Sequence, residues 1–320
     1  MRPRGRADRK VARDLHQPTY CSAQRMADEP ATPGTRHVSR GRWLVVIAAV
    51  MWSTSGLFAK SPWFDNWPIA GRGIQFAFWR ALFAGLIVLP LARRPQWSWK
   101  LVPMVATFLL MNVFYLGAMT RTTAANAIWL QSTAPFWVFL IGTLVFHEPV
   151  HRLDIVRLLF GAAGVGLILN FELRGEAWLG TLLGLASGVT YAGVVLSLRQ
   201  LRTFDAPFLI AVNHLFTAAA LLPVVWWLGV WPSGIQWPAL IGFGVMQMGI
   251  PYVLFTRGLR HIPSHEAAGL GLLEPLLVPL WVWIAWHYHP HYQAPNWWTL
   301  VGGALILTGL AIRYCKRIEK

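Results

Sequence analysis

Ten long apolar runs occupy most of this 320-residue chain, and they constrain its fold more than any other feature. A helix of roughly 20 apolar residues is long enough to cross the hydrocarbon core of a bilayer. The runs lie near residues 43–61, 74–91, 101–120, 123–146, 153–171, 178–198, 207–229, 237–257, 265–287 and 297–314. Only 13% of the residues are charged, about half the share that soluble domains carry. A soluble protein with buried helices accounts poorly for ten such runs, so we predict an all-α polytopic membrane protein with ten transmembrane helices.

The Lys and Arg residues are distributed unevenly between the loops. If the N-terminus is cytoplasmic, 23 of the 28 lie on the cytoplasmic side. The four on the other side are Lys60, Arg72, Arg121 and Arg174, and Arg80 lies within a span. Cytoplasmic loops retain such an excess because moving cations across a membrane is unfavourable. We therefore expect a multi-pass protein of the plasma (inner) membrane with both termini in the cytoplasm.

A formal net charge of +15 would suggest a nucleic-acid partner in a soluble protein. Here the cations flank apolar runs, so we expect the lipid bilayer as a partner and no nucleic acid. Residues 1–42 are rich in Arg, Pro and polar residues and lack the apolar core of a signal peptide, which predicts a disordered basic tail. Residues 315–320 form a short cytoplasmic tail. Cys21 and Cys315 lie in these flanks and imply no disulfide framework.

The ten spans divide into two sets of five, at residues 43–171 and 178–314. The two sets show faint similarity, for example between the fourth and ninth spans. There Ala127, Pro135, Val138, Leu140 and His147 recur as Ala267, Pro275, Val278, Leu280 and His287. Because five is odd, the second set enters the membrane from the opposite side. We therefore predict two inverted five-helix repeats, an architecture that many secondary transporters use.

Six short motifs are spread over both halves. They are Phe78-Trp79-Arg80, Thr123-Ala124-Ala125-Asn126-Ala127, Ser132-Thr133-Ala134-Pro135, Phe146-His147-Glu148, Leu273-Glu274-Pro275 and Gly302-Gly303-Ala304-Leu305-Ile306. Together they resemble the EamA-type domain, and the resemblance covers residues 43–314. It implies the drug/metabolite transporter superfamily, with ten helices in two inverted repeats and small organic solutes as substrates. Where the second repeat often has a Glu after the ninth span, this chain reads Trp286-His287-Tyr288-His289, so a role of that Glu is not expected here.

Two charged side chains, Arg80 and Glu274, lie well inside predicted spans rather than at their ends. A charge at that depth usually faces a cavity or a partner, because its transfer into lipid is unfavourable. Arg80 has two possible roles, as a counter-ion for an anionic group of the substrate or as a side chain that extends to the outer interface. Glu274 has three, since beside Pro275 it could bind a cationic substrate, take up a proton or belong to a structural kink. Pro135 holds the equivalent place in the fourth span, so we predict helix breaks at both prolines.

Several polar and aromatic side chains lie within the predicted spans. They are Asn112, Tyr115, Asn126, Gln131, Tyr191, Asn213, His214, Gln247 and Tyr252. Each alone could make an ordinary hydrogen bond between helices. Together with Arg80 and Glu274 they predict a polar, aromatic-lined cavity through which a substrate passes.

The segment His147-Glu148-Pro149-Val150-His151 matches a zinc-binding pattern that needs both imidazoles on one continuous helix. Pro149 disfavours helical geometry at Glu148, and the histidines 287, 289 and 291 lie on the opposite side, so we expect no metal site. Glu148 is instead a candidate cytoplasmic gate, or a topology device that meets Arg152 or the basic end of a neighbouring span. Residues Gly180, Gly184 and Gly188 predict close helix packing. The histidines near residue 289 are interpreted as a solvated loop, with adventitious metal binding and external pH sensing as alternatives.

These features favour a secondary transporter, more specifically an exporter, of a small organic metabolite by alternating access between the two repeats. We expect no enzymatic activity and no cofactor. Protons are a candidate coupling ion, and a monomer or weak dimer is the expected state. A nucleotide-sugar or phosphorylated-sugar exchanger is the first alternative, but it would need several basic residues in the cavity. An intramembrane lipid-modifying enzyme is the second, and it would need clustered carboxylates or histidines at one membrane depth.

Overall fold

The computed structural model describes residues 35–148 and 150–315, and every regular element in that part of the chain is a helix. The first five membrane segments are α2 (Thr35–Ser53) with α3 (Ser55–Ala59), α4 (Ile69–Val88), α5 (Leu101–Arg121), α6 (Ala124–Gln131) with α7 (Ala134–Phe146), and α8 (Arg152–Glu172). The last five are α9 (Trp178–Gln200), α10 (Ala206–Leu228), α11 (Gln236–Gly244) with the π-helical segment Val245–Gly249 and α12 (Ile250–Gly258), α13 (Ser264–Gly271) with α14 (Leu273–Trp286), and α15 (Trp297–Cys315). Short 3-10 turns, Pro62–Phe64 and Leu89–Leu91, follow α3 and α4.

In the described part of the chain, nine helical segments are long and apolar enough to cross a bilayer. A tenth apolar segment, Trp297–Ile312 in α15, is shorter. The predicted all-α fold with ten spans is confirmed. The helix α2 begins at Thr35, so residues 35–42, which the composition assigns to the tail, are helical. Hydropathy marks where lipid begins, whereas a helix continues beyond that point into the interface. The remaining tail residues, including Cys21, lie outside the described residues.

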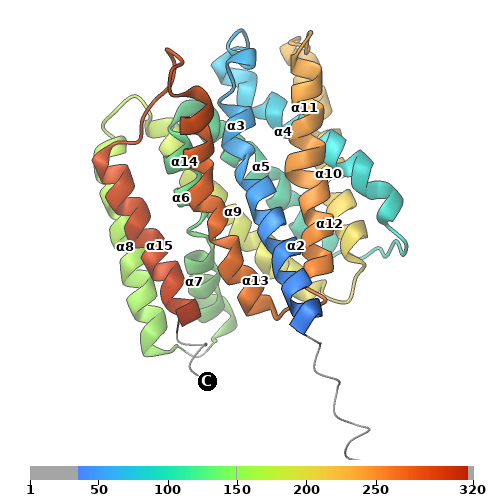
Figure 1. Ribbon diagram of the computed structural model, residues 1–320, viewed down its shortest axis with the longest axis vertical. Coiled ribbons are helices and arrows are strands. Elements are labelled where there is room, and N and C mark those ends of the chain that lie inside the picture. The colour runs from blue at the N-terminus through green and yellow to red at the C-terminus, as the bar shows by residue number, and fades with distance from the viewer. Residues whose placement is uncertain (1–34, 149, 316–320) are drawn as a thin grey trace, which may run out of the picture.

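The spans pack in a two-fold pattern. The helices α5, α6 and α7 of the first half pack against α9, and their counterparts α12, α13 and α14 of the second half pack against α2, the counterpart of α9. The helices α4 and α8 pack against their own counterparts α10 and α15, and the latter pair lies side by side in Figure 1. Equivalent spans therefore occupy equivalent places, as two inverted repeats require.

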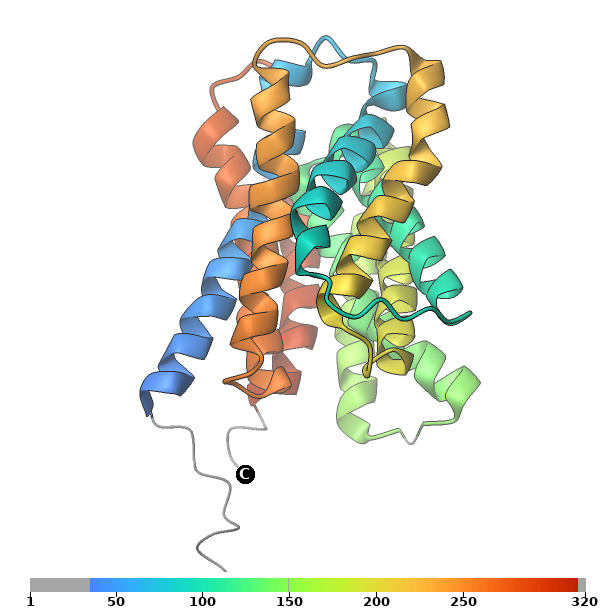
Figure 2. The same ribbon diagram turned by 90° about the vertical axis from the view of Figure 1, so that its right-hand side faces the viewer.

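The two ends of the bundle carry different connections. Figure 2 shows the chain entering α2 and leaving α15 at one end, as expected for an even number of spans. The opposite end carries the α3–α4, α10–α11 and α14–α15 connections. At that end Phe64, Trp67 and Phe76 are buried and lie with ring centroids 4.9 to 5.7 Å apart. This aromatic cluster anchors the α3–α4 loop to the bundle.

The glycines of α9 bring its backbone close to its neighbours. A Cβ atom at Gly180 would lie 2.8 Å from the backbone of Arg121, and one at Gly188 would lie 2.6 Å from the carbonyl oxygen of Leu130. Such distances leave no room for a side chain. The close packing predicted from the glycine row is confirmed.

Candidate functional site

The fourth and ninth spans are both interrupted near their middle. The break between α6 and α7 lies at Ser132 and Thr133, just before Pro135, and the break between α13 and α14 lies at Leu272, three residues before Pro275. Proline lacks a backbone donor and frees a carbonyl one turn earlier, which weakens the helix locally. The two breaks are linked, since the indole Nε1 of Trp129 donates to the carbonyl oxygen of Pro275 over 2.9 Å.

Arg80 lies in the protein interior, where its side chain is 2% exposed. Its guanidinium donates to Oδ1 of Asn112 on α5 and, over 3.5 Å, to Oε1 of Gln247 in the π-helical segment. The NH₂ groups of these two amides donate to the carbonyl oxygens of Phe108 and Trp52, at 2.8 and 2.9 Å. Both amides are therefore held with their oxygen atoms toward Arg80.

The guanidinium of Arg80 also lies over two aromatic rings. Its Cζ atom is 5.2 Å from the ring centroid of Phe243 and 5.9 Å from that of Tyr115, distances at which cation–π attraction operates. Amides and rings are neutral, so they orient the charge without cancelling it. In the part of the chain that the structure describes, Arg80 forms no ion pair with a carboxylate and its Nε atom has no hydrogen-bond partner.

Glu274 and three tyrosines surround the same region. The carboxyl of Glu274 is within electrostatic range of Arg80, and Tyr115, Tyr191 and Tyr252 are each within range of Glu274. Tyr191 lies in the middle of α9 and is 41% exposed, so its side chain is not enclosed by neighbouring helices. Side chains from four other predicted spans therefore lie within electrostatic range of Glu274.

His214 lies on α10, close to Tyr252, and is fully buried. Its ring centroid is 4.9 Å from that of Phe108 and 5.9 Å from that of Tyr252. Neither ring nitrogen has a hydrogen-bond partner among the described residues. His214 is also within electrostatic range of Arg80. We use the name central cluster for Arg80, Asn112, Tyr115, Tyr191, His214, Gln247, Tyr252 and Glu274.

The remaining predicted residues have other surroundings. Asn126 donates from its side chain to Oγ1 of Thr122 over 3.1 Å at the start of α6, where its backbone N–H donates to Oγ1 of Thr123. These contacts stabilise the first turn of a short helix, which is a structural role. Gln131 lies at the C-terminal end of α6, and Asn213 is buried on α10 beside His214.

Glu148 lies at the opposite end from the α14–α15 loop. Its carboxylate is 3.5 Å from Arg199 at the end of α9, and both side chains are about half exposed. The zinc pattern around it is not on one helix, because His147 ends α7 with a left-handed φ of 54° and His151 precedes α8. The residues described there therefore lack the geometry that two zinc ligands one helical turn apart require.

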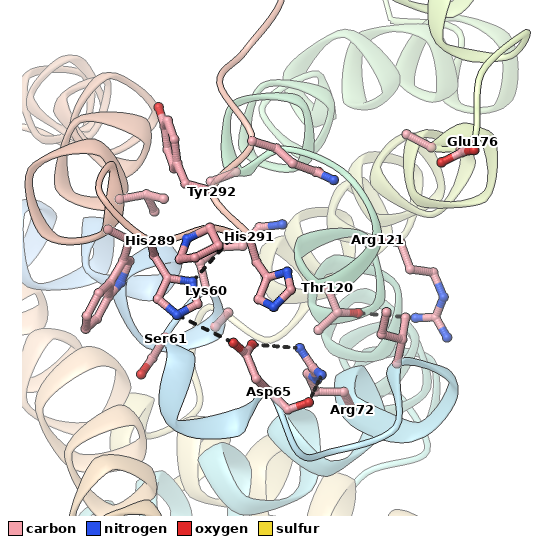
Figure 3. A pocket seen from close by; sticks show the side chains of 18 of the residues that line it. Lys60, Ser61, Asp65, Arg72, Thr120, Arg121, Glu176, His289, His291 and Tyr292 are labelled. Atoms are coloured by element: carbon pink, nitrogen blue, oxygen red, sulfur yellow. Dashed lines mark hydrogen bonds and ion pairs between the residues drawn. The ribbon is translucent and has the colours of Figure 1, made fainter.

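A cavity of about 740 Å³ lies at the other end of the bundle. It is lined by Lys60, Arg72, Arg121 and His289 among others, and we call it the outer cavity (Figure 3). Sequence reasoning missed it, because these cations served only to assign the topology. Their position near span ends on the same side of the membrane was the signal that could have found it.

An apolar layer separates the outer cavity from the central cluster. On α14, Glu274, Val278 and Val282 are each one helical turn apart, and Val282 lines the outer cavity. Gly56 of α3 packs so closely on this face that a Cβ there would lie 2.7 Å from Val282 and 3.0 Å from Val278. The next residue toward the centre, Ser55, shares a hydrogen bond of 2.8 Å with the Tyr115 hydroxyl. The close contact of α3 and α14 therefore lies between the outer cavity and the central cluster.

Known proteins resemble this chain over most of its length. The sequence pattern of the EamA-like transporter family matches residues 39–170 and again residues 178–315. The chain is 28% identical to an uncharacterized transporter of Archaeoglobus fulgidus, over 86% of this chain and 96% of that protein. It is 25% identical to a biotin transporter of Escherichia coli, over 82% of this chain and 89% of that protein.

Two further similarities concern a relative that is named as an exporter and a solved structure with a similar fold. The chain is 25% identical to the pseudopaline exporter CntI of Pseudomonas aeruginosa, over 73% of this chain and 83% of that protein. A solved structure described only as the crystal structure of a protein aligns with a TM-score of 0.60 and 20% identity, and covers 88% of this chain and 99% of its own. At that identity the solved structure supports the fold alone.

Proposed function

This chain belongs to the EamA-like transporter family, and from that premise we propose that it exports a small organic metabolite with an anionic group across the plasma membrane. Members of the family are named as transporters, so the chain is a multi-pass membrane transporter rather than an enzyme. The relative named as an exporter supports the outward direction. In this proposal the N- and C-termini are cytoplasmic, as the excess of Lys and Arg in those loops favours.

The observation that carries the proposal is the surroundings of Arg80. Two amide oxygens and two aromatic rings hold the guanidinium in place, yet no carboxylate among the described residues pairs with it. A buried cation without a counter-ion is unfavourable, and a carboxylate or phosphate of a bound solute would relieve that. This supports the role of Arg80 as the counter-ion of a substrate and argues against a side chain that extends to the interface.

Alternating access would follow from movement of one repeat against the other. We propose that residues 43–171 and 178–314 act as the two moving halves, with the central cluster between them. The apolar contact of Gly56 with Val278 and Val282 would be the closed gate on the outer side. The exposed pair of Glu148 and Arg199 would be a contact at the cytoplasmic end, broken and remade in each cycle.

The direct test is transport in liposomes with a panel of small organic acids, bases and neutral solutes. We expect wild-type protein to move one or more acids, and Arg80→Gln to lose that transport. Arg174→Gln removes a cation from the exposed α8–α9 loop and is the matched control, which should transport normally. Preferential transport of bases, or full activity of a folded Arg80→Gln protein, would overturn the proposal.

The second part of the proposal is that transport is coupled to protons and that Glu274 binds and releases the coupling proton. A carboxyl near Arg80 and three tyrosines, beside a helix break, is suited to exchanging a proton when the substrate binds or leaves. Glu274→Gln cannot bind or release that proton. If a proton gradient drives transport by the wild type, this variant should still exchange substrate across the membrane but should not accumulate it.

The sugar-nucleotide alternative is less well supported. A diphosphate group would need several cations at the centre of the bundle, and Arg80 is the only Lys or Arg in the central cluster. A transporter of such solutes would show counterflow of nucleotide sugars in the same liposome panel.

A further inference from the structure

Three cations line the outer cavity from three different parts of the chain. Lys60 follows α3, Arg72 lies in the first turn of α4, and Arg121 ends α5. Figure 3 shows these side chains around the same opening, with His289 and His291 of the α14–α15 loop beside Lys60. The outer cavity is distinct from the central cluster, because the apolar layer at Gly56 lies between them.

Backbone carbonyl groups hold these cations in place. Nζ of Lys60 donates to the carbonyl oxygen of Thr122 over 2.7 Å. Arg121 donates to the carbonyl oxygens of Ala70 and Gly117, at 2.9 and 3.2 Å. Carbonyl oxygens orient a charge but do not neutralise it. Within the described ranges, neither Lys60 nor Arg121 has a carboxylate as an ion-pair partner.

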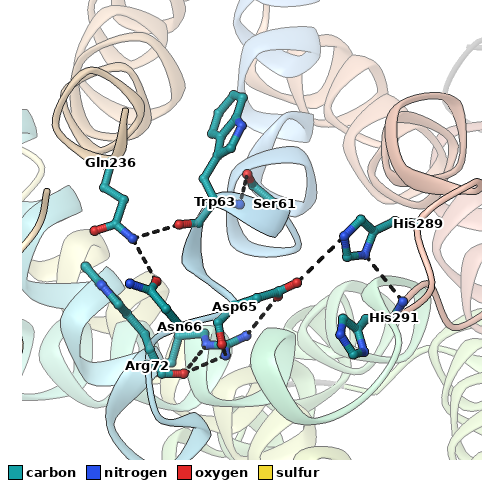
Figure 4. A network of polar contacts seen from close by, with 9 residues as sticks. Ser61, Trp63, Asp65, Asn66, Arg72, Gln236, His289 and His291 are labelled. Carbon is teal, nitrogen blue, oxygen red and sulfur yellow. Dashed lines mark hydrogen bonds and ion pairs between the residues drawn. The ribbon is translucent and has the colours of Figure 1, made fainter. Parts of the chain in front are cut away.

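The acidic groups at the cavity do not cancel this charge. Asp65 is shared, with one oxygen 3.7 Å from Arg72 and the other 3.8 Å from Nε2 of His289 (Figure 4). Glu176 lies at the rim on the far side from Lys60 in Figure 3. The backbone N–H of His291 donates to Nδ1 of His289 over 3.3 Å, which leaves the Nε2 side of that ring toward Asp65. The net charge around Lys60 and Arg121 is therefore positive.

The ammonium of Lys60 is unfavourable in the cavity as it stands. Burial, and secondarily the charge of Arg72, lower the pKa of Lys60 from 10.5 to about 8. An anion bound beside it would supply the missing opposite charge and raise that pKa again. The cavity also has the polar rim and the volume, about 740 Å³, that a small organic solute needs.

We propose that the outer cavity is a second binding site, in which Lys60 and Arg121 bind the carboxylate or phosphate group of a small organic anion. The inference rests on the proposed function in one respect, namely that such a solute passes along α14 between this site and the central cluster. Arg72 has a positioning role, since it fixes Asp65 and the loop before α4. The site would receive the solute on the outer side once the contact of α3 with α14 opens.

The test measures the reactivity of Lys60 in the full-length protein in phosphatidylcholine nanodiscs. An amine-selective reagent reacts only with the neutral amine, and mass spectrometry of peptides reports the initial rates at Lys60 and at the exposed Lys100. Rates are compared at pH 8 in sodium succinate, sodium phosphate and sodium chloride of equal ionic strength. A rise of about one unit in the pKa of Lys60 lowers its neutral fraction about fivefold at this pH, so succinate or phosphate should slow the reaction several-fold. Lys100 should not respond.

Two variants and one change of lipid complete the test. Arg121→Gln should abolish the protection of Lys60, whereas Arg80→Gln should retain it, because Arg80 belongs to the central cluster. Equal rates at Lys60 in all three salts would overturn the proposal, even if transport still depends on Arg80. Protection by phosphatidylglycerol nanodiscs, without any effect of succinate or phosphate, would assign the site to a lipid headgroup and would likewise overturn it.

Discussion

At the scale of single residues, Arg80 shows how a charge can be kept inside a membrane protein. Its partners are amide oxygens and aromatic rings, and the amides are themselves fixed by backbone carbonyls. A carboxylate in their place would neutralise the guanidinium and leave nothing for a substrate to bind. Glu274 acts on Arg80 only at longer range, and no carboxylate among the described residues is in direct contact with it. We propose that substrate binding depends on this absence of a direct ion pair.

Asn112→Asp tests this interpretation by introducing the missing carboxylate. The new side chain has nearly the same shape and can still accept from Arg80, but it loses the hydrogen bond to the carbonyl oxygen of Phe108, so folding is checked first by thermal unfolding in detergent. The new carboxylate should compete with an anionic substrate for Arg80 and weaken the apparent affinity for that substrate at least about tenfold. A tenfold change corresponds to about 1.4 kcal/mol of binding free energy, which a charge-assisted hydrogen bond to a buried guanidinium can supply. Asn296→Asp, in the exposed α14–α15 loop, is the control. Unchanged affinity in a folded Asn112→Asp protein would contradict the binding role of Arg80.

Lys60 predicts a pH dependence of stability. The pKa of Lys60 is about 8 in the folded protein, against 10.5 as its ordinary value. Between these values the unfolded chain holds a proton that the folded chain has released, so the folded state gains stability as the pH rises from 8 to 10.5. The unfolding temperature of the wild type should therefore increase relative to that of Lys60→Met over this range. The same comparison with Lys100→Met should show no trend, and an equal trend in both would contradict the assignment.

At the scale of helices, the contact between α3 and α14 is the feature that depends most clearly on one residue type. It depends on a glycine, because any side chain at position 56 would overlap with Val278 and Val282. The contact at Gly56 itself is apolar, and two indole groups of α14 flank it with hydrogen bonds, from Trp286 to the carbonyl oxygen of Leu57 and from Trp281 to Oγ of Ser53. In the proposed gate, opening would break these two hydrogen bonds as well as the apolar contact.

Gly56→Val should wedge this contact open. The added methyl groups cannot fit against α14, so the balance should shift toward a state open at the outer side. The measurement is the rate at which a membrane-impermeant thiol reagent, applied from the outer side, labels Ser55→Cys with and without this change. Labelling should be several-fold faster with Gly56→Val. Gly166→Val, on α8 where a Cβ meets nothing within 4 Å, should have no effect. Equal rates in all three proteins would contradict the gate.

The glycines of α9 have a structural role that can be separated from the gate. A Cβ at Gly188 would lie 2.6 Å from the carbonyl oxygen of Leu130 and from Oγ1 of Thr133, both at the break of the fourth span. Gly188→Ala should therefore lower stability by about 1–3 kcal/mol, as overpacking of a tight interface usually does. The measurement is the thermal unfolding temperature in detergent. Gly166→Ala is the control, and its unfolding temperature should not be lower than that of the wild type. If Gly188→Ala were as stable as the wild type, α9 could move away from the fourth span without a loss of stability, which would contradict the proposed structural role of this glycine.

At the scale of the whole molecule, the spans and the repeat were predictable because both follow from hydropathy, the distribution of cations and a count of helices. The positions of individual site residues depend on which helix faces meet, and hydropathy does not carry that information. Asn112 and Asn126 look alike in sequence, yet one contacts Arg80 and the other donates to Thr122 before the start of α6.

The outer cavity shows even more clearly that a sequence pattern does not reveal which residues meet in the folded chain. Asp65 and His289 are more than 200 positions apart in the chain, and only the tertiary fold brings them to 3.8 Å. The cations Lys60, Arg72 and Arg121 belong to separate loops and helix ends. A sequence pattern assigns them to the same side of the membrane but does not reveal that they share a cavity.

The central claim is that this transporter holds the anionic group of its substrate at Arg80. It is tested most directly in liposomes by comparing one transported acid with its uncharged amide, on the wild type and on Arg80→Gln. We predict that the wild type prefers the acid by at least about tenfold, a free-energy difference of about 1.4 kcal/mol, and that Arg80→Gln loses this preference. A preference for the acid that survives intact in the folded Arg80→Gln protein would contradict the account.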